Sequence, residues 1–303
     1  MIFFLNLTFI FKEYLFFLKN RMSKKSILFT ICFIVSFVAI ISIKAFFVKK
    51  NNSVSVNKTK KIVGIIPSYS IEKKKEGKWQ KYYNYHLLRD RYLDSFEDVC
   101  DNVSFVILPI SKTRSEELLS IVDGIIITGG LDIDGKYFNQ KTSDKVTDIE
   151  PERRTKFTID AVKHAMKNNK PLLGVCNGMQ IINIVNGGDL IQDINSMVEN
   201  SLPHSGNGDF YNYRHNIKVD NDSWLFRAVK KENIKVNSAH HQSVGKIGEN
   251  IKITAVADDG IIEALECSNC KKPIVGVQWH PEFLMTKYDK KIIKSFCDAV
   301  AND

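Results

Sequence analysis

Short, nearly continuous apolar runs recur along the middle of the chain and alternate with amphipathic stretches. The runs cover residues 62–67, 103–109, 123–128 and 172–175. Such runs are typical of strands buried on both faces, as in a parallel sheet. The stretches 82–99, 151–169 and 177–186 suit helices packed on that sheet. This order predicts an α/β fold with a mostly parallel central sheet flanked by helices.

In the last third of the chain the pattern changes to short β-like runs separated by turn residues. These runs cover residues 216–219, 234–237, 251–257, 261–267 and 274–279. A final amphipathic stretch, 288–300, places Ile292, Phe296 and Val300 on one helical stripe. No internal repeat is recognisable, so we expect residues 62–303 to form one domain.

The beginning of the chain differs from this domain. Residues 27–43 carry no charge and would make a helix of about 25 Å, just short of a hydrocarbon core of about 30 Å. We therefore expect one N-terminal hydrophobic helix, an uncleaved single-pass membrane signal anchor at 26–48, with a cleaved signal peptide as the alternative. Similar Lys and Arg counts on its two sides leave its orientation open. An extension, 1–25, precedes it and is largely absent if translation starts at Met22; a polar linker, 49–61, follows.

The net charge of +9 belongs to this leader. Residues 1–61 hold eleven Lys or Arg residues and one acidic residue, whereas the rest of the chain holds 32 basic and 33 acidic residues. A nearly neutral domain gives no ground for a nucleic-acid-binding face. Of six cysteines, only Cys267 and Cys270 are close neighbours. One such pair supplies half of a four-ligand zinc site, so we expect an exposed hairpin loop there and no metal.

The first sign of chemistry is a cysteine at the end of a predicted strand. Residues 172–175 lead directly into Cys176, and a helix-like apolar pattern follows. Gly174 and Gly178 flank the cysteine, so the backbone can turn tightly and pack closely. This is the pattern of a nucleophile elbow, whose helix N-terminus favours a thiolate and offers N–H groups to an oxyanion. A structural buried cysteine is the alternative.

A second polar group follows the predicted strand 274–279. His280 and Glu282 are separated by Pro281 and point to the same side, because side chains alternate along an extended segment. Glu282 can fix one ring nitrogen of His280 and leave the other to act as a base for Cys176. Together these residues predict a nucleophile, a base and an orienting acid, whereas His280 alone would indicate a satisfied core histidine.

Five blocks of the sequence resemble class I glutamine amidotransferase-like proteins and, within them, the γ-glutamyl-γ-aminobutyrate hydrolase-like branch of C26-type cysteine peptidases. The blocks are GIIITGGLDIDGKYF, PLLGVCNGMQIINIVNGGDLIQDI, VNSAHHQSV, DDGIIEALE and VGVQWHPEF. The resemblance covers about residues 62–300. It implies a flavodoxin-like three-layer fold and an omega-peptidase that hydrolyses C–N bonds of small γ-glutamyl substrates through a thioester. It implies no cofactor and no metal.

The resemblance also implies roles for individual residues. Cys176 is then the nucleophile, with His280 and Glu282 as its partners, and the backbone N–H groups of Gly130 and Asn177 form the oxyanion hole. The candidates for substrate binding are Gln180, His240, His241 and Gln242. For the HHQ segment, ordinary polar residues of a surface loop are the alternative.

The chain departs from this branch at four positions. Asn177 stands where the branch usually has Arg, Gly135 where it has Pro, and Thr155 and Thr158 where it has acids. None of them belongs to the predicted triad, so the chemistry is better defined than the leaving amine. Two other functions stay open: a glutaminase subunit that passes ammonia to a separate synthetase, and a membrane-tethered γ-glutamyl-binding module with little turnover. A homodimer is compatible with the sequence.

Overall fold

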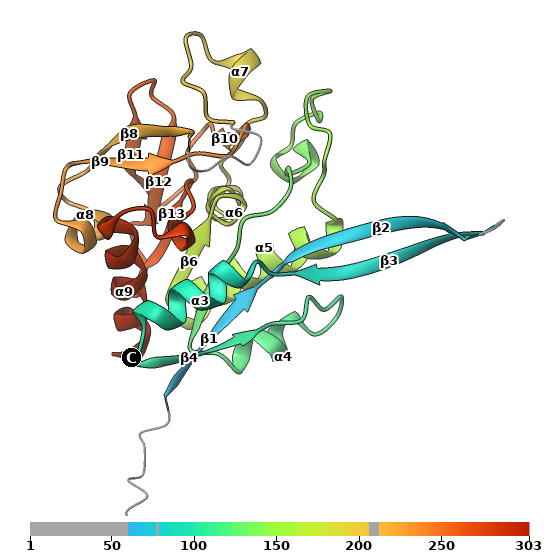
Figure 1. Cartoon of the computed structure of the whole chain (residues 1–303), viewed down its shortest axis with the longest axis horizontal. Coiled ribbons are helices and arrows are strands. Elements are labelled where there is room, and N and C mark those ends of the chain that lie inside the picture. The colour runs from blue at the N-terminus through green and yellow to red at the C-terminus, as the bar shows by residue number, and fades with distance from the viewer. Residues whose placement is uncertain (1–59, 77–78, 206–211, 303) are drawn as a thin grey trace, which may run out of the picture. The chain divides into compact units, whose positions relative to one another are not determined.

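The computed structural model describes residues 60–76, 79–205 and 212–302. Residues from Lys60 onward form one compact unit. Its core is an eleven-stranded mixed sheet, and a separate two-stranded ribbon accompanies it (Figure 1). The division of the chain into the four predicted segments stays a prediction.

One half of the large sheet is parallel, as the continuous apolar runs predict. Its strands, in spatial order, are β4 (Val103–Ile107), β1 (Lys61–Ile66), β5 (Gly124–Ile127), β6 (Leu172–Val175) and β13 (Ile274–Val277). Every residue of β5, β6 and β13 is buried. The carboxyl ends of β5, β6 and β13 therefore meet at one edge of the sheet, which is where open α/β sheets bind ligands.

The other half of the sheet is antiparallel, so the sheet is mixed and not mostly parallel as predicted. Its strands are β12 (Ile262–Cys267), β11 (Ile251–Ala257), β8 (Arg214–Val219), β9 (Asn233–Asn237), β10 (Ser243–Val244) and β7 (Leu190–Ile191). In β8 buried and more exposed residues alternate, which is typical of an antiparallel sheet with one face toward solvent. Four of the five short runs of the last third are β8, β9, β11 and β12, and the fifth, 274–279, is β13 of the parallel half.

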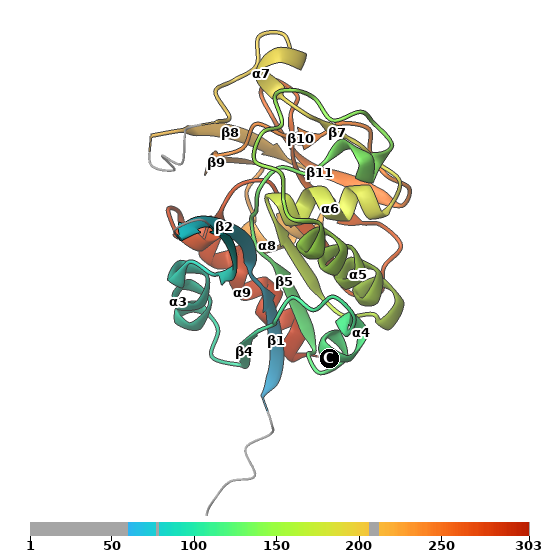
Figure 2. The same ribbon diagram turned by 90° about the vertical axis from the view of Figure 1, so that its right-hand side faces the viewer.

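Helices cover both faces of the parallel half, which makes three layers (Figure 2). The helices are α3 (Asp90–Val99), α4 (Ser115–Ser120), α5 (Glu152–Asn168), α6 (Asn177–Val185), α7 (Ile194–Met197), α8 (Trp224–Val229) and α9 (Lys287–Ala301), with 3-10 turns η1 (Gly135–Phe138) and η2 (Pro281–Phe283). Helices α3 and α9 lie on one face, and α4, α5 and α6 lie on the other. Each face has its own apolar core, and strand β6, in the middle of the sheet, contributes residues to both cores.

The stretch 82–99 does not form the single helical segment that its amphipathic pattern predicts. Strand β3 (Trp79–Leu87) pairs with β2 (Ser68–Glu76) along its whole length, and helix α3 begins only at Asp90. The sequence of this ribbon is polar and rich in lysine. Because the two strands pair only with each other, no buried sheet face imposes an apolar pattern on them, and the sequence signal is weak.

The expected membrane anchor is not supported. None of the helices in the described ranges combines the length and the apolar character that crossing a bilayer requires. This finding contradicts the predicted single-pass membrane localisation and gives no support to the predicted membrane partner. The hydrophobic helix expected at 26–48, the extension before it and nearly all of the linker lie outside the described residues.

Two disulfides were not foreseen from the sequence. Cys100, just after α3, is joined to Cys297 on α9, across 197 positions of the chain. Cys267 is joined to Cys270 within the loop between β12 and β13. That loop confirms the predicted hairpin, although both cysteines are partly buried. Cys176 is the free cysteine of the described residues.

The two disulfides differ greatly in the length of chain that they close. A cross-link that closes a long loop restricts the unfolded chain most and typically stabilises a protein by about 2–5 kcal/mol. We expect C100S/C297S to lose about this much free energy of unfolding in a urea titration, and the matched C267S/C270S variant to lose clearly less. Equal losses in the two variants would show that loop closure is not the source of the stabilisation.

Candidate active site

Cys176 lies at a left-handed corner between β6 and α6, as the glycine pattern predicts. Its backbone has φ 51° and ψ −106°, a conformation that costs a non-glycine residue about 1–3 kcal/mol. A Cβ on Gly174 would lie 2.6 Å from the backbone of Gly178, and a Cβ on Gly178 would lie 2.7 Å from the carbonyl oxygen of Ile127. The two glycines therefore let helix α6 sit directly on strands β5 and β6, which holds the strained corner.

His280 follows β13 and is held from two sides. Its Nδ1 lies 2.7 Å from Oε1 of Glu282, which is fully buried. The side chain of Asn237 accepts a hydrogen bond from the backbone N–H of His280 at 3.0 Å and donates one to the carbonyl oxygen of His280 at 2.9 Å. No sequence pattern indicates this amide clamp. Both the ring and the backbone of His280 are thus fixed.

The surroundings of His280 favour its protonated form. Burial by itself lowers the pKa of this imidazole, but the charge of Glu282 and the contacts with Cys176 outweigh burial and raise the pKa to about 10. At neutral pH His280 is therefore an imidazolium beside Cys176. A cationic neighbour of this kind favours the thiolate form of a cysteine.

A pocket of about 510 Å³ opens above these residues. Cys176, His280, Gly129 and Gly130 all line it. The chain approaches closely at Gly129, where a Cβ would lie 2.9 Å from Cε1 of His280 and 3.7 Å from Cβ of Cys176. The ends of β5, β6 and β13 thus meet in one cavity.

The backbone N–H groups of Gly130 and Asn177 are the two predicted for the oxyanion hole. The N–H of Gly129 donates to the Tyr92 hydroxyl and that of Leu131 donates to Glu150. Among the described residues the N–H of Gly130, between them, has no hydrogen-bond acceptor. Asn177 is the first residue of α6, and the first N–H groups of a helix lack partners within the helix.

A buried arginine holds the two segments that carry these N–H groups, the loop after β5 and the start of α6. Arg154 is fully buried and donates to the carbonyl oxygen of Thr128 at 2.7 Å and to Oδ1 of Asn177 at 2.8 Å. Its charge is balanced by Glu150 at 3.0 Å. The Asn177 side chain also donates to the carbonyl oxygen of Leu131 at 2.8 Å. Asn177, which replaces the usual Arg, therefore ties helix α6 to the glycine loop.

Three residues of the site were not identified from the sequence. Tyr92 and Arg89 line the pocket, and Arg154 holds its wall. Burial and the nearby charge of Glu282 raise the pKa of Tyr92 far above its usual value, so its hydroxyl stays protonated. The first two residues come from the segment around the start of α3, which is far in sequence from Cys176, and no spacing could have indicated them.

The four candidate substrate-binding residues do not line the pocket. Gln180 donates to the carbonyl oxygen of Gln242 and to Gln278, while the Gln242 side chain exchanges two hydrogen bonds with the backbone of Ile133.

His240 and His241 also contact protein groups. His241 lies between Asp132 and Asp193, at 2.8 and 3.2 Å. His240 faces Glu263 at 3.4 Å. Only Ala239, just before them, lines the pocket. These contacts brace the loop after β5 and give no support for a direct contact with substrate.

The comparisons with known proteins agree with this architecture. The family model Peptidase C26 matches residues 61–282. The glutamine amidotransferase-like protein YvdE of Lactococcus lactis is 35% identical over 214 residues, which cover 69% of this chain and 87% of the relative. A glutamine-hydrolysing GMP synthase subunit of Methanocaldococcus jannaschii is 31% identical over 198 residues, which cover 64% of this chain and 84% of the relative.

Two solved structures share the fold. A Thermoplasma acidophilum protein assigned as a GMP synthase subunit has a TM-score of 0.55 at 17% identity, covering 81% of this chain and 96% of its own. The acivicin-bound glutaminase domain of Trypanosoma brucei CTP synthase has a TM-score of 0.53 at 17% identity, covering 80% and 94%. At this identity the likeness concerns the fold alone, whereas the family match spans the described domain from β1 to η2. The chain belongs to the Peptidase C26 family, whose relatives are glutamine amidotransferase-like proteins.

Proposed function

We propose that the chain hydrolyses γ-glutamyl amide bonds, with Cys176 as nucleophile, His280 as acid and base, and Glu282 as orienting group. One observation carries the proposal: a cysteine at a strained elbow, an imidazolium and an unpaired backbone N–H converge on one pocket. A buried structural cysteine would need neither a left-handed corner nor a charged neighbour.

The reaction begins with attack of the Cys176 sulfur on the δ-carbonyl carbon of the γ-glutamyl group. The oxyanion accepts hydrogen bonds from the backbone N–H groups of Gly130 and Asn177. One donor of this kind typically contributes about two to three orders of magnitude in rate. The C–N bond then breaks as His280 gives its Nε2 proton to the leaving amine, and a γ-glutamyl thioester remains.

Water completes the cycle. Neutral His280 accepts a proton from the water that attacks the thioester, the carbon–sulfur bond breaks, and glutamate leaves. The short contact with Glu282 holds Nδ1 as a donor throughout, so that Nε2 is the nitrogen that exchanges protons. Every proton step uses residues of this chain.

The pocket favours an amine larger than ammonia as the leaving group. Leu87, Leu88 and Leu131 form part of its wall, and Leu87 and Leu131 are 52% and 42% exposed. Apolar side chains at the mouth of a pocket suit the carbon skeleton of a leaving amine. Arg89, on the same wall, suits a carboxylate of the substrate.

The second candidate is a glutaminase that supplies ammonia to a separate synthetase. Its support comes from the relatives, which include the glutamine-hydrolysing GMP synthase protein of M. jannaschii, 31% identical to this chain. The two functions share the chemistry at Cys176 and differ in the leaving group and in the partner. A γ-glutamyl-binding module with little turnover is the third, and the same assays test it.

Replacing the nucleophile tests the proposal directly. In the full chain we expect C176A to lower kcat/KM for γ-glutamyl-γ-aminobutyrate and other γ-glutamyl amides by about four orders of magnitude or more, because the thioester cannot form. The matched control, C267S/C270S, removes two cysteines far from the pocket and should keep its activity. Full amidase activity in C176A would refute the assignment.

Assays with the same set of γ-glutamyl amides separate the candidate functions. A hydrolase acts on γ-glutamyl amides of larger amines without any partner. Ammonia release from glutamine that rises sharply only when a synthetase is added favours the glutaminase. Labelling of Cys176 by a γ-glutamyl electrophile, without turnover of any γ-glutamyl compound, favours the binding module.

Arg89 offers a test of substrate anchoring. A hydrogen bond to a charged group contributes about 1.5–3 kcal/mol, so R89Q should lower kcat/KM about 10- to 100-fold, mainly through a higher KM. Arg91, two residues further along, packs over Phe283 and does not line the pocket; R91Q is the matched control. If R89Q and R91Q changed KM equally, Arg89 would not contact the substrate.

The pH profile tests the role of Glu282. The imidazolium of His280 is lost as the pH rises through its pKa of about 10, so kcat/KM should fall on the alkaline side near that pH. Removing the negative charge of Glu282 lowers the pKa of His280, and E282Q should therefore move the alkaline limb to lower pH. An unshifted limb in E282Q would show that another group controls it.

A further inference from the structure

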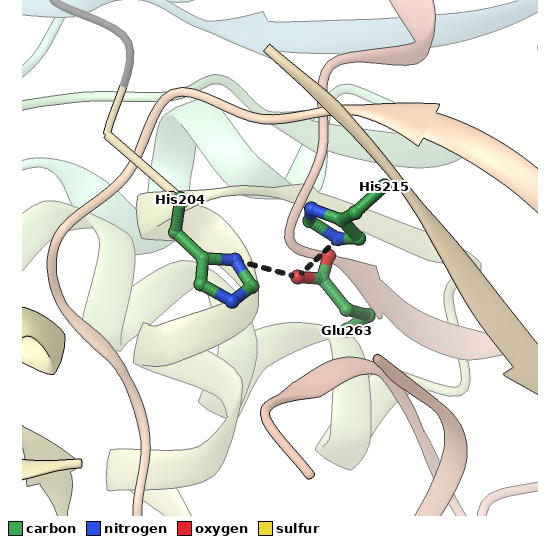
Figure 3. Close-up of side chains that lie close together, drawn as sticks. All are labelled: His204, His215 and Glu263. Carbon is green, nitrogen blue, oxygen red and sulfur yellow. Dashed lines mark ion pairs between the residues drawn. The ribbon is translucent and has the colours of Figure 1, made fainter. Parts of the chain in front are cut away.

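A second buried cluster of titratable side chains lies in the antiparallel half of the sheet, outside the pocket (Figure 3). Oε1 of Glu263 lies 3.3 Å from Nδ1 of His204, 3.0 Å from Nε2 of His215 and 3.4 Å from Nε2 of His240. All four side chains are at least 94% buried. Three imidazole nitrogens thus converge on one carboxylate oxygen.

Hydrogen bonds on the far side of two of these rings fix which nitrogen carries the proton. Nδ1 of His240 lies 3.0 Å from the carbonyl oxygen of Gln242. A carbonyl only accepts, so Nδ1 donates and Nε2 of the neutral ring turns a lone pair toward Glu263. Nε2 of His204 lies 2.9 Å from Oδ2 of Asp259 and donates to it, so in the neutral ring the lone pair of Nδ1 faces Glu263.

In this cluster, hydrogen-bond acceptors therefore face one another: lone pairs of imidazole nitrogens point toward the carboxylate of Glu263. Among the described residues neither carboxylate oxygen of Glu263, neither ring nitrogen of His215, nor Nε2 of His240 has a hydrogen bond of acceptable geometry. Ser238 does not relieve His204, because its hydroxyl donates to the His204 carbonyl oxygen. Unpaired buried polar groups are costly, and an ionised carboxylate more so. A positive charge between these atoms removes the conflict.

We propose that His204, His215 and Glu263, with His240 packed beside them, bind one divalent transition-metal ion, with Zn²⁺ as the typical occupant. Zn–N and Zn–O bonds of about 2.0–2.1 Å in a tetrahedron put neighbouring ligand atoms about 3.3 Å apart, close to the 3.3 and 3.0 Å that separate Nδ1 of His204 and Nε2 of His215 from Oε1 of Glu263. Metal-binding histidines typically donate their other nitrogen to a carboxylate or a backbone carbonyl. Asp259 provides such a partner for His204.

This site is distinct from the proposed catalytic one and is structural in kind. Its ligands come from β8, β12 and the loop after α7, so one ion would join three segments, and His240 beside it lies in the loop after β9. The loop after β9 also carries Ala239, a wall residue of the pocket, and the N–H of His240 donates to the His204 carbonyl oxygen at 3.0 Å. The ion would thus hold one wall of the pocket in place without reaching the reacting atoms.

Metal analysis of the purified full chain, without an affinity tag, tests the site. After dialysis against Zn²⁺ and then against metal-free buffer we expect about one zinc per chain by mass spectrometry of the elements. A strong chelator should lower Tm, and added Zn²⁺ should restore it. H215A and E263Q should lose the bound equivalent, whereas H164A, which replaces a buried histidine paired with Glu116 elsewhere, should keep it.

Two controls keep the test independent of the active site and of folding. C176A should retain the zinc, because the ion does not use the catalytic thiolate. The Co²⁺-substituted wild type should show visible absorption without a thiolate charge-transfer band, since its ligands are nitrogen and oxygen only. Less than a tenth of an equivalent of metal with no effect of Zn²⁺ on Tm, or metal that is lost in C176A, would overturn the site.

Discussion

The structure depends on one constraint: Cys176 must hold a left-handed backbone at the junction of β6 and α6. The energy for this comes from packing, because Gly174 and Gly178 let α6 lie against the central strands without intervening side chains. Both apolar cores meet around β6, so the corner is supported from each face of the sheet. The neighbouring strands β5 and β13 then bring Gly130 and His280 to the same edge.

Charge is arranged around that corner in two separate pairs. Glu282 and His280 form the pair that faces the sulfur, while Arg154 and Glu150 form a buried pair behind the glycine loop. Asn177 connects the pair behind the loop to α6 through its amide. In this chain the residue after the proposed nucleophile therefore orients the backbone around the proposed oxyanion hole and carries no charge of its own.

Much of the parallel half could be predicted from the sequence, because its strands are buried on both faces and their apolar runs are continuous. The turn at Cys176 could be predicted from the glycines on either side of it, and the His280–Glu282 pair from its place directly after a predicted strand. The β2–β3 ribbon, the mixed sheet and the wall formed by Arg89 and Tyr92 depend on pairings over long distances, which leave no local pattern. The cluster around Glu263 was missed for the same reason, since its histidines are scattered from His204 to His240 and show no metal-ligand spacing.

The central claim is that the reaction passes through a covalent bond to Cys176. Rapid acid quenching during turnover of a γ-glutamyl amide, followed by peptide mass spectrometry, measures this bond directly. The account predicts a γ-glutamyl group on the peptide that contains Cys176, formed at least as fast as the amine is released. Steady hydrolysis with no adduct on that peptide, or an adduct that forms more slowly than product, would contradict it.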